Sequence, residues 1–405
     1  MTNLLKMAYR NLGRNRRRSV LSALALAIGV ALLLFISAFF QGEMRGSMES
    51  TLRLDSGHIQ VRSADYDPDK LSVAWEYLVE SPEQIAVQIE ALDLVQTATP
   101  RLVASGIVSV RDESSGVQIM GIDPASDANS IYRQGLIDGE FLTADDREGI
   151  LIGSPLAENM GLKVDDEFTL LVNTSNGNVD EQKFTVRGIF STGATTYDKG
   201  IVFLPLAKAQ AFSGADNHAS YIFVMLHDKE QAETVAAQIT GPNYQAKTWK
   251  EMNELLVLLD DFAGAYIGMI NLIVLGVTAT VIVNTLLMSV FERTREIGIL
   301  TAIGMKGRQV MSLFLIEAFF LAVGGVTVGL LGGWVLSAYF GQVGIYFGDL
   351  GVTGIVFEDR IYAYLTLADA INLTITTFII TLLASLYPAR TASRMEPVEA
   401  LHSAQ

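Results

Sequence analysis

The sequence contains no cysteine and only four histidines among its 405 residues. The missing cysteines exclude disulfides, thiolate nucleophiles and iron–sulfur clusters. No two histidines have the spacing of a helical zinc motif such as H-E-x-x-H. We therefore predict no metal site in this chain.

Familiar catalytic motifs are also missing. The string closest to a phosphate-binding loop, Gly304-Met305-Lys306-Gly307-Arg308, lacks both the glycine spacing and the hydroxyl that would bind magnesium. Gly153-Ser154-Pro155 departs from the nucleophile elbow G-x-S-x-G. Acidic pairs such as Asp145-Asp146 are explained by solvated turns. We expect no catalytic residue, no bound cofactor and no enzyme activity in this chain.

Charged residues are scarce, at 18% of the sequence, while half of the residues are apolar. Long uncharged or nearly uncharged runs predict four membrane spans, at residues 19–41, 262–291, 310–340 and 367–387. The first run has 22 uncharged residues, Ser19 to Phe40, which exceeds the apolar core of about 7 to 15 residues in a signal peptide. We therefore expect a retained span there.

The distribution of charge predicts the orientation. Residues 1–18 carry six basic residues and no acid, and basic residues also follow the second and fourth spans. The positive-inside rule then places residues 1–18, 292–309 and 388–405 in the cytoplasm, and 42–261 and 341–366 outside. The periodicity of residues 1–18 predicts an amphipathic helix lying on the membrane; alternatively, these charges serve only to orient the chain.

The large external segment is acidic and mixes strand and helix patterns. Residues 42–261 hold 35 acidic and 16 basic residues, which argues against nucleic acid or anionic headgroups as its partner. Alternating or β-branched runs bounded by glycine or aspartate predict strands at 58–62, 106–111, 117–122, 167–172, 183–190, 201–204 and 221–226. Helices are expected at 81–92, 156–160, 206–212 and 229–239, with stalk helices 43–54 and 249–262 joining the membrane spans. The predicted fold class is a membrane protein with four transmembrane α-helices, one plus three, and a large α+β extracytoplasmic domain inserted between the first two.

Two features lie within the third span. Gly325, Gly329 and Gly333 recur every four residues, and this stripe predicts close helix packing, either within one bundle or at a dimer seam. Glu317 is an acid near the cytoplasmic end of the span, where water or an arginine can reach it. A structural role for Glu317 is favoured over ion coupling, because a proton-driven carrier usually needs a relay.

Three short sequence segments, which occur in a fixed order next to the predicted spans, resemble those of a known family. They are Met7 to Arg18 (MAYRNLGRNRRR), Glu292 to Met305 (ERTREIGILTAIGM) and Pro388 to Leu401 (PARTASRMEPVEAL). With them the sequence resembles the FtsX-like permeases of ABC transporters, the group that includes MacB and the lipoprotein-releasing LolC and LolE. Because the ATPase of MacB is fused at its N-terminus and this chain starts at the membrane, the lipoprotein-release branch is the expected one.

The resemblance implies a coupling segment that docks on a separate ATPase subunit. It assigns this role to Glu292, Arg293, Arg295, Glu296, Gly298, Ala302, Ile303 and Gly304. The pattern agrees, since Ile297, Leu300 and Thr301 share a helical face and Gly304 can end the helix. Topology alone would explain the arginines but not this apolar spacing.

The resemblance further implies two ATPase copies that bind ATP and magnesium, and a second permease chain that is identical or different. It implies a prokaryotic inner-membrane location with lipid around the spans. The expected function is to pass ATP-driven motion to the external domain and so extract or export a lipoprotein or another amphiphile. A lipoprotein or a periplasmic carrier is then an expected partner. The alternative is a signalling module that activates a cell-wall hydrolase or reports a ligand without transport.

Overall fold

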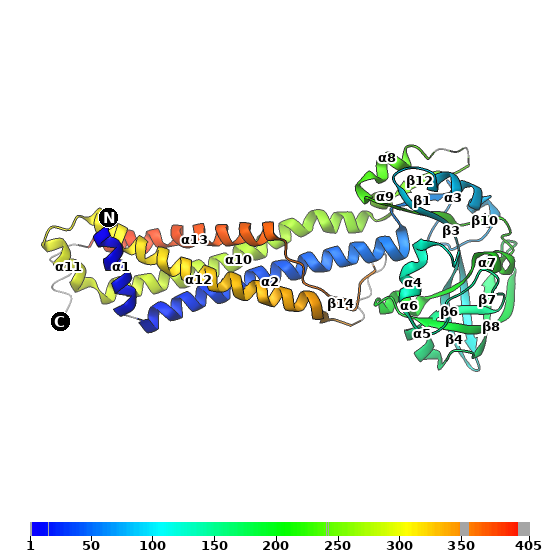
Figure 1. Ribbon diagram of the computed structural model, residues 1–405, viewed down its shortest axis with the longest axis horizontal. Helices are drawn as coiled ribbons and strands as arrows, with labels where there is room; N and C mark the ends of the chain where they lie inside the picture. The colour runs from blue at the N-terminus through cyan, green and yellow to red at the C-terminus, as the bar shows by residue number, and fades with distance from the viewer. Residues whose placement is uncertain (1, 15, 240, 242, 349–355, 396–405) are drawn as a thin grey trace. The chain divides into compact units, whose positions relative to one another are not determined.

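The computed structural model describes residues 2–14, 16–239, 241, 243–348 and 356–395. The chain forms two compact units. One contains Met1–Met44, Asp260–Ile345 and Ile361–Gln405, and the other contains Arg45–Leu259 and Tyr346–Arg360. The first unit is helical and the second is built on a β-sheet (Figure 1).

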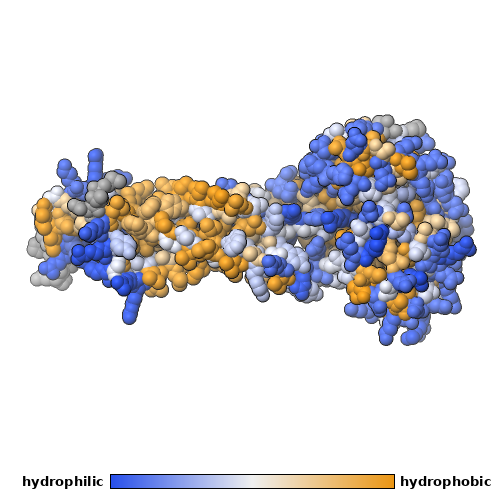
Figure 2. All heavy atoms as spheres, in the orientation of Figure 1, coloured by the Kyte–Doolittle hydropathy of each residue, from blue (hydrophilic) through white to orange (hydrophobic). Residues whose placement is uncertain are grey.

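Among the described residues, four helices are long and apolar enough to cross a membrane. They are α2 (Arg16–Thr51), α10 (Glu254–Glu292), α12 (Gly307–Val343) and α13 (Leu367–Ser393). Figure 2 shows an apolar surface along these helices and a polar surface at the end where the N-terminus lies. Lipid requires such an apolar exterior. The predicted arrangement of one span followed by three is confirmed.

Two short helices lie at one end of this bundle (Figure 1). The first, α1 (Thr2–Arg14), precedes α2 and contacts α12 through the rings of Tyr9 and Phe320, whose centroids are 6.3 Å apart. The second, α11 (Thr294–Ala302), lies between α10 and α12. The amphipathic pattern of residues 1–18 therefore forms a helix as far as Arg14.

The fourth long helix continues beyond its predicted end. The sequence places a boundary at Pro388, but α13 passes through this proline and ends at Ser393. Proline removes one helical hydrogen bond and crowds the preceding turn, but Ala389 and Ala392 are buried in a cluster with Val290 and Phe314. Packing on neighbouring helices therefore outweighs the local signal. Residues 396–405 of the predicted tail, and with them the end of the third family string, lie outside the described residues.

The second unit contains a ten-stranded sheet in the order β12-β1-β11-β3-β4-β9-β6-β8-β5, with β7 pairing with β3 and β8. Neighbours are antiparallel except for β4 with β9 and β6 with β8. The strands are β1 (Ile59–Arg62), β3 (Val95–Val110), β4 (Glu113–Ile122), β5 (Leu136–Gly139), β6 (Gly149–Gly153), β7 (Glu167–Asn173), β8 (Val179–Phe190), β9 (Ile201–Pro205), β11 (Tyr221–Leu226) and β12 (Gln245–Thr248).

Short helices connect the strands and confirm the α+β class of this unit. They are α3 (Pro82–Glu90), α4 (Ser130–Gln134), α5 (Ser154–Met160), α6 (Thr195–Gly200), α7 (Leu206–Ser213), α8 (Ala232–Ala236) and α9 (Trp249–Met252). Two small ladders pair β2 (Val79–Glu80) with β10 (His218–Ala219) and β13 (Ile345–Tyr346) with β14 (Arg360–Ile361).

The longest strand, β3, is the main departure from the predicted strands. It has 16 residues, of which Val95 to Arg101 pair with β11 and Leu102 to Val110 pair with β4. The sequence predicts only its last part, from Gly106. Residues 97–104 are buried without interruption, so no alternation marks them as a strand.

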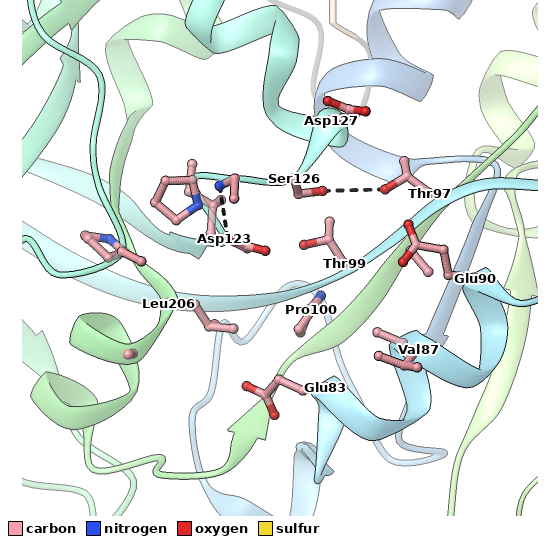
Figure 3. Close-up of a pocket in the computed structure, with 18 of the residues that line it drawn as sticks. Glu83, Val87, Glu90, Thr97, Thr99, Pro100, Asp123, Ser126, Asp127 and Leu206 are labelled. Carbon is pink, nitrogen blue, oxygen red and sulfur yellow. Dashed lines mark hydrogen bonds between the residues drawn. The ribbon is translucent and has the colours of Figure 1, made fainter.

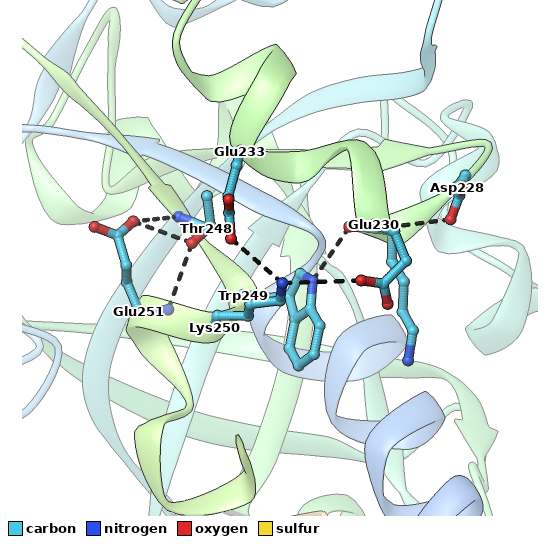
Figure 4. Close-up of polar contacts among 8 residues, drawn as sticks. Asp228, Glu230, Glu233, Thr248, Trp249, Lys250 and Glu251 are labelled. Atoms are coloured by element: carbon cyan, nitrogen blue, oxygen red, sulfur yellow. Dashed lines mark hydrogen bonds and ion pairs between the residues drawn. The ribbon is translucent and has the colours of Figure 1, made fainter. Parts of the chain in front are cut away.

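Two predicted helices are interrupted. Residues 229–239 form a 3-10 turn (Lys229–Gln231) followed by α8, and the helix predicted over 249–262 breaks at Asn253 between α9 and α10. Thr248 begins α9 with a capping box, in which its backbone N–H donates to the carboxylate of Glu251 (Figure 4) and so lowers the pKa of Glu251. The buried indole of Trp249 lies 5.1 Å from the ammonium of Lys229.

Part of the predicted external loop 341–366 belongs to the β-sheet unit. Its residues 349–355 lie outside the described residues, but Asp359 accepts hydrogen bonds from the backbone N–H of Thr195 at 3.1 Å and from its hydroxyl at 2.6 Å. Glu358 accepts a bond from the hydroxyl of Ser50 at 2.6 Å. In addition to α2 and α10, this loop therefore runs from the helical unit into the β-sheet unit.

Candidate functional site

The segment between α10 and α12 is the candidate site, and one side of it is buried. On α11, Ile297 and Gly298 are buried while Leu300 and Thr301 are half-buried. Ile297 packs in a cluster with Val290, Val310 and Phe314 from the neighbouring helices. The apolar face that the sequence predicted around Ile297 thus holds α11 on its own bundle.

The opposite side of α11 is exposed. Arg295, Glu296, Ile299, Ala302 and Ile303 lie on the surface, and the side chain of Ile303 is 80% exposed. We call these five residues the coupling surface. The coupling surface combines apolar side chains with one basic and one acidic side chain. It lies outside the apolar runs of the neighbouring helices α10 and α12. Such a mixed patch is typical of a contact between proteins.

A buried ion pair fixes the start of α11. Arg293 lies between α10 and α11, and its Nη1 is 3.2 Å from Oε2 of Glu317 on α12. The two side chains are 5% and 3% exposed. The second Nη of Arg293 donates to the backbone carbonyl of Asn11 on α1 at 3.3 Å. One guanidinium therefore joins α11, α12 and α1.

The far end of α11 is closed by glycine. Gly304 has φ +103°, and the N–H of Met305 donates to the carbonyl of Leu300 at 3.0 Å. The N–H of Gly304 donates to Thr301, also at 3.0 Å, which completes a Schellman motif. The helix therefore ends at the glycine that the sequence indicated.

The structure separates the predicted coupling residues into two groups. Glu292, Arg295, Glu296, Ala302, Ile303 and Gly304 are exposed, and Glu296 forms an ion pair with Arg14 of α1. Arg293 and Gly298 are buried, so they are not available to a partner that docks on this surface. Ile299 is exposed and was missed because the sequence pattern favoured the other face.

The three glycines of the stripe, Gly325, Gly329 and Gly333, face α2 of the same chain. A Cβ added to Gly325 would lie 2.8 Å from Cδ2 of Leu26, and one added to Gly333 would lie 2.9 Å from Cβ of Leu34. At Gly329 the added atom would lie 2.6 Å from the carbonyl oxygen of Ala27. These contacts place the stripe inside one bundle, where it lets the two helix backbones approach.

Comparison with protein-family models finds two matches that together span most of the chain. Residues 19–241 match the MacB-like periplasmic core domain, and residues 268–397 match the FtsX-like permease C-terminal region. The second match contains α11 and the glycine stripe.

Comparison with known proteins finds relatives over nearly the full chain. A lipoprotein-releasing system transmembrane protein LolC of Neisseria meningitidis is 25% identical, covering 95% of this chain and 93% of the relative. An uncharacterised ABC transporter permease of Methanocaldococcus jannaschii is 22% identical, covering 98% and 97%. A macrolide export ATP-binding/permease protein MacB of a Shewanella strain is 23% identical, and this chain spans 60% of its length.

Solved structures similar to this chain include two extracytoplasmic regions. The extracellular domain of the transporter YknZ from Gram-positive bacteria is 15% identical, with a TM-score of 0.34, and covers 47% of this chain and 99% of its own. The periplasmic region of MacB from Actinobacillus actinomycetemcomitans is 14% identical, with a TM-score of 0.35, covering 49% and 91%.

Proposed function

Because more than half of the chain matches the MacB-like periplasmic core domain, the chain belongs to that family, and we propose that a separate ATPase drives it through the coupling surface. It is an ABC transporter permease of the LolC and MacB type. In this proposal, the ATPase subunit binds ATP and magnesium, and the permease chain binds neither. Two ATPase copies and a second permease chain, identical or different, complete the assembly.

The observation that carries the proposal is the exposed coupling surface on a helix whose other side is fixed. Ile299 and Ile303 are 43% and 80% exposed at one end of the bundle. Isolated exposed apolar residues are common, but here two isoleucines, an alanine and two opposite charges lie together on one short helix and its C-cap. An ATPase that buries this helix would gain an apolar contact flanked by charge pairs.

Movement of α11 has a direct route into the bundle. The guanidinium of Arg293 links α11 to Glu317 of α12 and to α1, so displacement of α11 pulls on both helices. The 39 residues of α10 cover about 58 Å, and the 36 residues of α2 cover about 54 Å, both longer than a hydrocarbon core of about 30 Å. We propose that these two helices carry the movement toward the external domain.

The relatives suggest the class of substrate. LolC is named for lipoprotein release and MacB for macrolide export. Both cargoes are amphiphiles or apolar molecules that partition into a membrane. We therefore propose that this chain helps to extract or export a lipoprotein or another amphiphile, which a periplasmic carrier then accepts.

The chain is a multi-pass membrane protein of the type found in the cell inner membrane. We propose that both termini and α11 lie in the cytoplasm, since residues 1–18 hold six basic residues and no acid. The acidic segment 42–261 then lies outside.

A single substitution on the coupling surface tests ATPase docking. Ile303→Asp puts a charge where the proposal has an apolar contact, and we expect at least about tenfold less ATPase to purify with the tagged chain in mild detergent. Ile137→Asp is the matched control, since Ile137 is 62% exposed on the β-sheet unit. Undiminished ATPase recovery with Ile303→Asp would show that this surface is not the docking site.

Depletion of the chain distinguishes transport from signalling. The comparisons do not favour a signalling module, because the named relatives release or export molecules. Transport predicts that an amphiphile accumulates in the inner membrane when the chain is depleted. Normal export together with altered cell-wall cleavage would instead support the signalling alternative.

A further inference from the structure

A cleft of about 560 Å³ opens in the β-sheet unit. It lies between α3, the first part of β3, the segment that follows β4 and the start of α7 (Figure 3). Its volume is within the range of about 300 to 1,000 Å³ that is usual for small-molecule sites. The cleft is therefore large enough for a ligand.

The charged residues of this cleft are all acidic. Glu83 and Glu90 come from α3, and Asp123 and Asp127 come from the segment after β4. Figure 3 shows these four side chains arranged around Thr99. No lysine, arginine or histidine lines the cleft, and none of the four acids forms an ion pair within the described part of the chain.

The floor of the cleft holds a polar group without a partner. The side chain of Thr99 is 2% exposed, and its hydroxyl has no hydrogen-bond partner in the structure. Few buried polar groups in native proteins stay unpaired, because losing water without gaining a partner is unfavourable. This hydroxyl is thus ready to accept a hydrogen bond from a ligand.

The wall opposite α3 is held in place before any ligand arrives. The side-chain amide of Asn129 donates to the carbonyl of Asp123 at 2.8 Å, and Arg133 donates to the carbonyl of Pro124 at 2.9 Å. One carboxylate oxygen of Asp123 also accepts from the N–H of Ala125 at 3.0 Å. A wall fixed in this way loses little entropy on binding.

We propose that this cleft binds a ligand that carries two or more alkylammonium groups on an apolar chain. The spread carboxylates would pair with separate ammonium groups, and the hydroxyl of Thr99 would accept an N–H. Val87, which is 68% exposed, and Leu206 provide apolar surface for the linking carbons. A metal ion fits poorly, because no group of three or more suitable ligands occurs in the described regions.

Calorimetric titration of the full chain with spermidine tests this inference. The chain is placed in nanodiscs of neutral phosphatidylcholine, so that anionic lipid does not compete for the polyamine. We expect saturable binding with one ligand per chain, weakened by salt. A capped tri-lysine peptide serves as the second probe. Tighter binding of spermidine would identify the ligand as a polyamine, and tighter binding of the peptide would identify it as a basic peptide segment.

Two variants and a matched control complete the test. Glu90→Gln/Asp127→Asn removes one carboxylate from each wall and is expected to weaken spermidine binding about tenfold. Thr99→Val is expected to weaken binding about threefold without lowering the melting temperature, because it removes an unpaired hydroxyl. Glu113→Gln/Glu158→Gln removes two exposed acids elsewhere on the same unit and should leave binding unchanged.

Three results would overturn the inference. The first is an absence of binding for both probes at millimolar concentration. The second is an equal loss of binding in the control and in Glu90→Gln/Asp127→Asn, which would indicate nonspecific attraction to an acidic surface. The third is full affinity in Thr99→Val, which would show that the ligand does not reach the floor. None of these results depends on whether the chain transports an amphiphile.

Discussion

At the residue scale, Arg293 and Arg295 show how two similar side chains in one segment can differ in burial. Arg293 and Arg295 lie two positions apart in the family string ERTREIG, and the sequence does not distinguish between them. The structure exposes Arg295 but buries Arg293 against Glu317. In the proposed function, Arg293 therefore contributes by holding α11 in position and does not contact the partner directly.

Removing either member of this pair should be costly. Arg293→Met removes a guanidinium that pairs with the buried carboxylate of Glu317, and we expect a loss of about 3–5 kcal/mol in unfolding free energy. Glu317→Met should have a similar effect. The double variant should recover most of the loss, since an apolar pair of similar volume can replace a buried ion pair.

Thermal unfolding of the purified chain in detergent measures these effects. Arg295→Met is the control, because that exposed arginine should contribute less than about 1 kcal/mol. If the two single losses simply add in the double variant, the side chains are not coupled and the ion pair does not hold α11 in place.

At the scale of elements, the contact between α2 and α12 depends on the missing side chains of three glycines. An alanine Cβ at position 329 would lie 2.6 Å from both the carbonyl oxygen of Ala27 and the Cβ of Val30. Backbone cannot move aside as a flexible side chain does. Even one methyl group would therefore push the two helices apart.

Gly329→Ala tests this contact with a neighbouring glycine as control. We expect Gly329→Ala to lower the unfolding free energy by about 1–3 kcal/mol through overpacking. Gly324 has no atom within 4 Å of an added Cβ, so Gly324→Ala should be neutral or more stable by up to about 1 kcal/mol from helix propensity. Equal melting temperatures for the two variants would contradict the packing described for α2 and α12.

At the scale of the whole molecule, charge is divided unevenly along the chain. Residues 42–261 carry a net charge of 16 − 35 = −19, and the rest of the chain carries 13 − 9 = +4. Basic segments stay in the cytoplasm during insertion, whereas a large acidic domain can be translocated. We therefore expect the β-sheet unit to be accessible from outside the cell membrane.

The missing cysteines allow a direct measurement of this orientation, because any introduced thiol is unique. Gly13→Cys and Val179→Cys are suitable, since nothing lies within 4 Å of a Cβ at Gly13 and Val179 is 64% exposed. A membrane-impermeant maleimide applied to spheroplasts should label Val179→Cys only, and should label Gly13→Cys after permeabilisation. The reverse pattern would invert the proposed topology.

Much of this protein could be predicted from the sequence because the signals involved are local. The length of an apolar run determines whether a helix spans a membrane, and the charges beside it determine its orientation. Alternating residues indicated strands such as 167–172, a continuous apolar run indicated 221–226, and Gly304 indicated the end of α11. The family strings surround the spans, so they too could be found without coordinates.

Only the tertiary structure decided which face of each element meets a neighbour. Ile297 and Ile303 are both apolar, so the sequence does not show which of them is buried. Ile297 is buried against α10, α12 and α13, and Ile303 is exposed. The same holds for the continuous burial of β3, the helix through Pro388 and the partner of Glu317. Each depends on residues far away in the chain, and packing against them outweighs the short-range preferences that a sequence reveals.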